Sequence, residues 1–219
     1  MDFLNIFIAP AKVGQNVLKK KTFPWILLVA IIFLSLITFA LSMQQTREMV
    51  IQQLKRQYEM MGQQLTASAL ESMIGITMIS ALVGVVLSPI VLWFLFSLVL
   101  FLLGGFRDSE GSFKQTLTLV GYCNLISALG GIITAGLMMA GIQNVDFSPA
   151  LFISAEAAPG LLVTSLLQSF NLFRIWKYVA LGIAYGSFME KKSSAVTLTV
   201  VLFVLSTAAM TVPVLFMPK

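Results

Sequence analysis

A run of 31 uncharged residues, from Met73 to Leu103, constrains the fold of this chain more than any other feature. A helix needs about 20 apolar residues to cross a hydrocarbon core of about 30 Å. This run would form a helix of about 46 Å, so we expect it to tilt, to protrude or to kink at Pro89. Only 11% of the residues are charged and 58% are hydrophobic. With so few polar side chains the protein cannot cover a water-facing surface, and lipid must cover much of it.

Three other segments are long and apolar enough to be predicted as membrane spans. They are Phe23–Met43, Gly121–Ile142 and Ala195–Phe216. One more span is expected between Ser148 and Met189. The sequence therefore predicts a single domain over residues 1–219, an all-α, polytopic membrane bundle of about five transmembrane helices.

The span between Ser148 and Met189, the fourth in chain order, has ambiguous boundaries. We prefer a span at Gln168–Met189, with Pro149–Val163 as a re-entrant or surface segment. The alternative is a span at Leu151–Phe173 followed by a surface helix. The ambiguity arises because prolines and charges interrupt the apolar pattern at Pro149, Glu156, Pro159, Arg174 and Lys177.

The basic residues predict the orientation. Cytoplasmic loops of membrane proteins carry an excess of lysine and arginine, and only the segment after the first span, which also holds glutamates, departs from this trend here. The N-terminus is therefore expected in the cytoplasm, and we expect a bacterial cytoplasmic (inner) membrane protein. The first span is too long for a usual signal peptide and is expected to stay as an anchor. The cytoplasmic positions are Lys12, Lys19, Lys20, Lys21, Arg107, Lys114, Lys191 and Lys192.

Two extramembrane segments carry readable patterns. Residues 1–22 place large apolar residues before lysines, which fits a segment on the cytoplasmic membrane surface or a plain flank of the anchor. Residues 44–72 are expected to contain an extracytoplasmic amphipathic helix that packs on its own bundle or binds a partner. Its apolar stripe has spacings of three and four: Val50, Leu54, Tyr58, Met61 and Leu65.

The turn between the second and third spans is predicted from local chemistry. Gly104-Gly105 can end a helix in the left-handed conformation. Ser112 and Gln115 form a capping box that starts the next helix at Phe113. The charges between them, Arg107, Asp108 and Glu110, are expected to be solvated.

Small residues at four-residue spacing mark expected helix contacts within the bundle, or alternatively a dimer face or the lining of a narrow path. They are Ser80, Gly84 and Ser88 in the second span, and Gly131 with Ala135 and Gly136 with Ala140 in the third.

The stretch WFLFSLVLFLLGGFRDSEGSFKQTLTLVGYCNLISAL resembles the core pattern of the Yip-type, or Ypt/Rab-interacting, membrane proteins. That pattern consists of an apolar helix, a Gly-Gly turn, a Gly-Ser-Phe sequence with a basic residue that begins the next helix, and a Gly-Tyr pair within that helix. The family usually has a proline soon after Gly-Tyr, and residues 124–127 have none here, so we expect a straighter helix. The resemblance is carried by Gly104, Gly105, Gly111, Ser112, Phe113, Lys114, Gly121 and Tyr122.

A second stretch, FNLFRIWKYVALGIAYGSFMEKKSSAV, is similar to the family's later span and its basic turn into the last helix. The resemblance implies a five-span helical bundle. Eukaryotic members are linked to Rab GTPases and carry a long cytoplasmic N-terminal region. Here about 22 residues precede the first span, as in the shorter bacterial form, so Rab binding is not expected. The matching positions are Phe173, Trp176, Gly182, Lys191, Lys192 and Ala195.

Catalytic and metal chemistry find little support in the composition. The chain has no histidine and a single cysteine, Cys123, so it lacks imidazole bases, ordinary zinc sites and any intrachain disulfide. No acid has the spacing of a metal or phosphate loop. We therefore expect a protein that is not an enzyme and has no cofactor or metal. The net charge of +5 reflects cytoplasmic lysines and not a nucleic-acid partner.

Two cations inside the predicted fourth span form the candidate anion or lipid site. Asn171, Arg174 and Tyr178 share one helix face, and Lys177 lies beside it. A cation at the bilayer centre costs about 3 kcal/mol or more. One interpretation is that both side chains extend to the interface, or that the helix begins later than predicted.

The other interpretation is that both cations face the bundle interior and bind an anion. Glu71, Glu156 and a phosphate headgroup are the candidates, and the forked donors of Arg174 suit this role. The sequence thus leaves two functions open. The first is a non-enzymatic scaffold that organises membrane proteins or lipids. The alternative is a transporter, channel or lipid-handling protein with an anion site between helices. Expected partners are the bilayer and its anionic lipids, and a protein partner or a second copy is left open.

Overall fold

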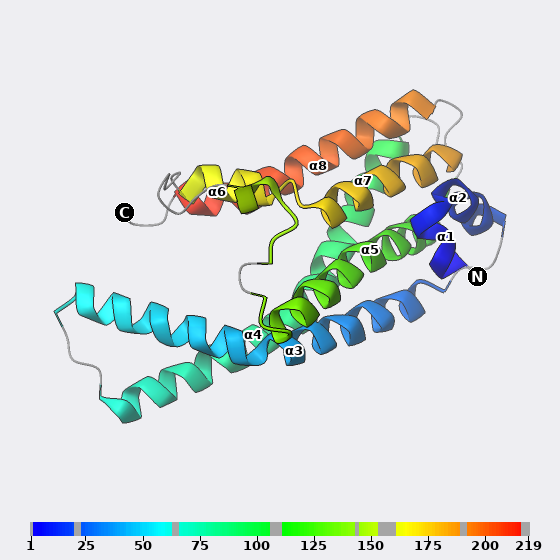
Figure 1. Ribbon diagram of the computed structural model, residues 1–219. Coiled ribbons are helices and arrows are strands. Elements are labelled where there is room, and N and C mark those ends of the chain that lie inside the picture. The colour runs from blue at the N-terminus through cyan, green and yellow to red at the C-terminus, as the bar shows by residue number, and fades with distance from the viewer. Residues whose placement is uncertain are drawn as a thin grey trace.

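The chain folds into a helical bundle (Figure 1). The computed structural model describes residues 2–19, 23–62, 66–105, 111–142, 145–152, 161–188 and 192–215. The α-helices are α1 (Asp2–Ile8), α2 (Pro10–Lys19), α3 (Pro24–Met60), α4 (Ala67–Gly105), α5 (Phe113–Met139), α6 (Leu161–Gln168), α7 (Leu172–Tyr185) and α8 (Lys192–Leu215), with the short 3-10 helices η1 (Pro149–Phe152) and η3 (Gly186–Phe188).

In the part of the chain that the structure describes, four helices are long and apolar enough to cross a membrane. The apolar spans lie in Pro24–Met60, Ala67–Gly104, Phe113–Met139 and Ala195–Val212. They contain most of the first, second, third and last spans expected from the sequence, which confirms the predicted helical membrane bundle. Helix α4 continues through Pro89 without interruption.

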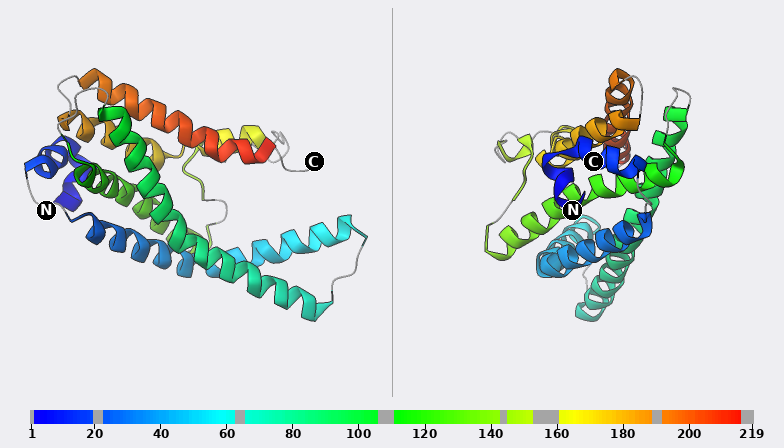
Figure 2. Two further views of the ribbon diagram at one scale, coloured as in Figure 1. Left: turned by 180° about the vertical axis from the view of Figure 1, so that it is seen from behind. Right: turned by 90° about the vertical axis from the view of Figure 1, so that its right-hand side faces the viewer.

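Helices α3 and α4 form a long hairpin that projects beyond the other helices (Figures 1 and 2). The predicted extracytoplasmic segment, residues 44–72, is not a separate helix. Helix α3 continues from the first span to Met60, and α4 begins at Ala67. With 37 and 39 residues, each helix measures more than about 50 Å and exceeds the hydrocarbon core.

The projecting part of the hairpin is held by contacts between its two helices. Val50, Leu54 and Tyr58 are half-buried there, as the predicted stripe requires. The Tyr58 hydroxyl lies 3.5 Å from the Met73 sulfur. Met61, the C-cap of α3, is exposed, and Leu65 lies outside the described residues.

Helix α5 is the centre of the bundle and packs on α3, α4 and α7. Its first half is buried on all sides, from Thr116 to Gly121. A side chain on Gly121 would meet Leu27 at 3.1 Å, so the glycine lets α3 approach α5 closely. The indole of Trp93 donates a 2.8 Å hydrogen bond to the Leu117 carbonyl and joins α4 to α5.

The N-terminal segment packs on the bundle. Helix α2 buries Val13, Gly14 and Val17 against α7, η3 and α5. A Cβ on Gly14 would clash with the Ala184 carbonyl oxygen. Nε2 of Gln115 donates to the carbonyls of Val17 and Leu18, at 3.1 and 3.0 Å. Phe23 and Trp25, at the start of α3, are largely exposed, as aromatic residues at a membrane interface are.

The predicted fourth span differs from the structure at its start. Helix α7 begins at Leu172 and not at Gln168. Residues 169–171 are not helical and separate α6 from α7. Both short helices pack along α8 and run side by side with it (Figures 1 and 2). Neither α6 nor α7 is among the helices long and apolar enough to cross a membrane in the described part of the chain, so the predicted fourth span is not one continuous helix. Of the predicted segment Pro149–Val163, the structure describes η1 and the start of α6.

The small-residue positions divide into packed and open ones. A Cβ on Gly131 would lie 3.4 Å from Thr38 of α3, so this glycine serves the predicted helix contact. Gly136 and Gly84 have no neighbour within 4 Å of such a Cβ, and Ser80 and Ser88 are exposed. The prediction that these positions pack inside the bundle is therefore wrong for the second span.

Candidate functional site

The interruption between α6 and α7 places the first turns of α7 next to a cavity. Asn171 is the N-cap of α7, and its side-chain oxygen accepts a hydrogen bond of 3.0 Å from the Phe173 amide. This local bond starts the helix at Leu172 in place of a continuation from α6. Arg174 and Lys177 follow in the first two turns.

At the interruption, one backbone amide donates its hydrogen bond to a segment from earlier in the chain. The Leu172 amide donates to the Phe147 carbonyl at 3.0 Å, and the Phe147 ring packs edge-on against Phe173. On the other side of Phe173, Gly130 of α5 leaves room for the ring. Irregular backbone in a membrane protein is tolerated where it lines a cavity, and Gln168 and Asn171 line one here.

The cavity has a volume of about 730 Å³ and lies between α3 and α5 on one side and α6, α7 and α8 on the other. All four predicted site residues line it, so the structure brings Asn171, Arg174, Lys177 and Tyr178 together. Whether they bind an anion stays a prediction. The other polar lining side chains are Thr38, Ser42, Thr46, Ser127, Thr134, Gln168 and Ser206.

Most of the threonine and serine hydroxyls on the wall already donate within their own helices. Thr38 donates to the Leu34 carbonyl, Thr46 to that of Ser42, and Thr134 to that of Gly130. Their oxygens remain available as acceptors. The two cations are therefore the strongest hydrogen-bond donors that face the cavity.

Arg174 is fixed against α8. Its Nη2 atom donates to Ser206 Oγ at 2.7 Å and to Thr207 Oγ1 at 3.2 Å. Its Nη1 atom lies 2.8 Å from the sulfur of Met210, and its guanidinium lies 5.4 Å from the ring centre of Phe203. A guanidinium has five N–H donors, so these contacts orient Arg174 and leave part of its donor capacity free.

Lys177 is held differently. Its ammonium lies 5.4 Å from the ring centre of Phe96 and 5.2 Å from that of Tyr178. Within the described part of the chain it has no carboxylate partner, since the ion pair found there joins Arg47 to Glu71. Lys177 also lines a second cavity of about 410 Å³ between α3, α4 and α5. The two cavities therefore share this ammonium.

The structure excludes one of the candidate partners that the sequence left open. Glu71 is wrong as a partner of Arg174, because it pairs with Arg47 at 3.1 Å in the hairpin and is well exposed. Glu156 lies outside the described residues. Helix α7 begins later than the predicted span, at Leu172, and both Arg174 and Lys177 line the cavity.

The motif turn, meaning the family-motif residues Gly104, Gly105, Gly111, Ser112, Phe113, Lys114, Gly121 and Tyr122, lines neither cavity in the described part of the chain, and its role is architectural. The Ser112 hydroxyl accepts a hydrogen bond from the Gln115 backbone amide, and the Ser112 backbone amide donates to Gln115 Oε1, so the predicted capping box is present. Gly104 and Gly105 are the last residues of α4 and are helical, so the expected left-handed cap is not found at them. Gly111 precedes the cap. Arg107, Asp108 and Glu110 lie outside the described residues.

The remaining residues of the motif turn join helices through aromatic contacts. Phe113 packs edge-on against Phe94 and Phe101 of α4. The Lys114 ammonium lies 5.9 Å from the ring centre of Phe23, and Tyr122 packs against Phe3 of α1. None of the motif-turn residues is among the described residues that line the two cavities.

Sequence reasoning missed the polar wall that faces the cations. Thr38, Ser42 and Thr46 occur at four-residue spacing in α3, which places them on one helix face. This spacing within an apolar run is the signal that could have revealed them. No group of three His, Cys, Asp or Glu side chains suited to a metal ion occurs in the described segments.

Comparison with known proteins gives one informative match. The family model described as the Yip1 domain matches residues 4–214. No curated protein and no solved structure gives a significant match.

Proposed function

We propose that this chain, which belongs to the Yip1 family, holds an anionic lipid by its headgroup in the cavity beside α7. The observation that carries the proposal is the Lys177 ammonium. Lys177 lines a cavity in a bundle of apolar helices and has no carboxylate partner among the described residues. A cation in such a place is costly, and an anionic ligand would offset that cost.

The two cations have complementary roles in this proposal. Arg174 is oriented by Ser206 and Thr207 and provides a planar donor of fixed direction. Lys177 is a flexible point charge between two rings. A phosphate between them would form charge-assisted hydrogen bonds, each contributing about 1.5–3 kcal/mol. The hydroxyl oxygens of the opposite wall can accept from a headgroup that carries hydroxyls or an amine.

The proposed role is binding without chemistry on the lipid. No nucleophile with an activating base lines the cavity among the described residues. We place the protein in the bacterial cytoplasmic membrane with its N-terminus in the cytoplasm, since the basic residues favour that orientation.

A membrane scaffold is the second candidate function. The observation that favours it is the α3–α4 hairpin, which projects from the bundle (Figure 2) and carries exposed charges such as Lys55 and Arg56. Mild purification followed by mass spectrometry separates the two candidates. A stoichiometric protein partner would favour the scaffold, and a stoichiometric anionic lipid would favour lipid binding.

The direct test compares two double variants with the same charge change. Arg174→Gln/Lys177→Gln removes the cavity cations, and Lys55→Gln/Arg56→Gln removes two exposed cations of the hairpin. Lipids that remain bound after mild purification are quantified by mass spectrometry. We expect the cavity variant to lose the anionic lipid and the hairpin variant to keep it. Equal retention by both variants would refute the proposal.

A further inference from the structure

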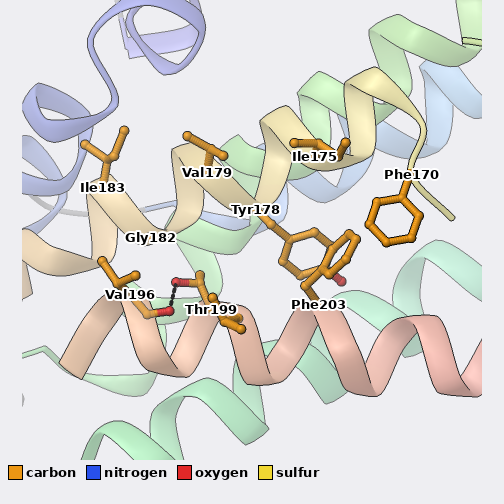
Figure 3. Close-up of a pocket in the computed structure, with 10 residues that line it drawn as sticks. Phe170, Ile175, Tyr178, Val179, Gly182, Ile183, Val196, Thr199 and Phe203 are labelled. Carbon is orange, nitrogen blue, oxygen red and sulfur yellow. Dashed lines mark hydrogen bonds between the residues drawn. The ribbon is translucent and has the colours of Figure 1, made fainter. Parts of the chain in front are cut away.

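A groove between α7 and α8 lies next to the candidate anion site. It has a volume of about 400 Å³ and is lined almost entirely by apolar side chains. Figure 3 shows Phe170 at one end, Ile183 and Val196 at the other, and the rings of Tyr178 and Phe203 between the two helices. The hydroxyl of Thr199 donates to the Ala195 carbonyl at 2.6 Å, so it adds little polarity to the groove.

The shape of the groove follows from the contact between its two helices. At Gly182 the helices lie so close that a Cβ would be 2.8 Å from Thr199 Oγ1. Toward Phe170 the space between them contains the edge-to-face pairs of Phe203 with Tyr178 and with Phe170. The α7 residues that line the groove run from Ile175 to Ile183, about 12 Å of helix, and Phe170, which precedes α7, extends the lining further. One leaflet of the hydrocarbon core is about 15 Å thick, so an acyl chain can lie along the groove.

Two rings connect this groove with the cations. Tyr178 lines both the groove and the large cavity. Phe203 lines the groove, and its ring lies 5.4 Å from the Arg174 guanidinium. At Tyr178 and Phe203, the apolar surface of the groove therefore adjoins the positive charge of Arg174 and Lys177. A ligand that uses both needs an anionic head and a long hydrocarbon chain.

We infer that the groove binds one acyl chain of a phospholipid whose phosphate lies at Arg174 and Lys177. This inference rests on the proposed function and specifies its ligand as a long-chain anionic phospholipid. A free anion or a short-chain amphiphile would use the cations alone. The groove walls are open to lipid, since Val179, Val196 and Val200 are about half exposed, so a chain can enter from the bilayer.

The test fills the groove without changing any charge. Val200 lines the groove and Val204 does not, and both are 56% exposed on α8. Val200→Trp should block the groove, and Val204→Trp is its matched control. Val179→Trp fills the groove from α7 and serves as a second variant if Val200→Trp does not fold. Binding is measured in detergent with phosphatidylglycerol carrying 16-carbon chains, with dihexanoyl phosphatidylglycerol and with glycerol phosphate.

We expect the wild type and Val204→Trp to bind the long-chain lipid more tightly than the other two probes, by about tenfold or more, since buried methylene groups add affinity. Val200→Trp or Val179→Trp should lose this preference and keep the weak binding of the short probes. If the groove variants bind the long-chain lipid like Val204→Trp while Arg174→Gln/Lys177→Gln does not bind it, the groove inference is wrong and the proposed function stands. If the double variant binds all probes like the wild type, the proposed function itself fails.

Discussion

Arg174 and Lys177 are close in sequence and differ in how the fold treats them. Arg174 donates to three side chains of α8, whereas Lys177 rests on two aromatic rings. The first arrangement stabilises the contact of α7 with α8. The second leaves an ammonium in a costly position, which is typical of residues retained for function at the expense of stability.

Single replacements of these cations should therefore change stability in opposite directions. In detergent without lipid, Lys177→Met should raise the melting temperature and Arg174→Met should lower it. A change of about 1 kcal/mol moves the midpoint by roughly 2–4 °C for a chain of this size. Thermal unfolding followed by tryptophan fluorescence measures both. A lower melting temperature for Lys177→Met would show that the ammonium has a stabilising partner.

Two glycines of α5 provide a matched test of the packing beside the site. A Cβ on Gly130 would lie 2.5 Å from the Phe173 ring, and one on Gly136 would meet nothing within 4 Å. We expect Gly130→Ala to destabilise the protein by about 1–3 kcal/mol through overpacking. Gly136→Ala should be neutral or slightly stabilising, because alanine favours a helix by up to about 1 kcal/mol. Chemical denaturation of both variants measures the difference, and equal effects would contradict the packing described here.

At the scale of elements, the sequence predicted the long apolar helices but was wrong about a separate helix over residues 44–72 and missed the interruption before α7. The length of the apolar segments placed four spans correctly, because a helix needs about 20 apolar residues to cross the hydrocarbon core. The capping box at Ser112 was equally predictable, since its partner is three residues away. The interruption before α7 depends on Phe147, which gives no local signal and reaches Leu172 only in the folded chain. Asn171, a good N-cap residue, was the one local indication.

Gln115 joins two elements, and this makes a specific prediction. It completes the capping box of α5 and also binds the carbonyls of Val17 and Leu18 in α2. Ser112→Ala should cost about 1 kcal/mol through the cap alone. Gln115→Ala should in addition loosen α2. Hydrogen–deuterium exchange should therefore increase in α2 for Gln115→Ala and stay near the wild-type level there for Ser112→Ala. Unchanged exchange in α2 for both variants would show that Gln115 does not hold that helix.

At the scale of the molecule, the predicted topology places the α3–α4 hairpin and α2 on opposite sides of the membrane. Gln57 in the hairpin and Gln15 in α2 are both exposed, and the native Cys123 is fully buried. In intact cells, an impermeant thiol reagent should label Gln57→Cys and leave Gln15→Cys unlabelled until the membrane is opened. Labelling of Gln15→Cys from outside would reverse the orientation.

The candidate site depends on the whole bundle, which is why the sequence revealed only part of it. Its cations were visible as charges within an apolar segment, whereas its opposite wall is formed by Thr38, Ser42 and Thr46 of α3. These residues lie far from Arg174 along the chain. Only the packing of α3, α5, α7 and α8 brings the two walls together.

The most direct test of this account is a density map of the protein in nanodiscs that contain anionic phospholipid. We expect phosphate density about 2.7–2.9 Å from Lys177 Nζ, with Arg174 on its other side and an acyl chain between α7 and α8. A carboxylate of the chain paired with Lys177, or a cavity without density for an anion, would contradict it.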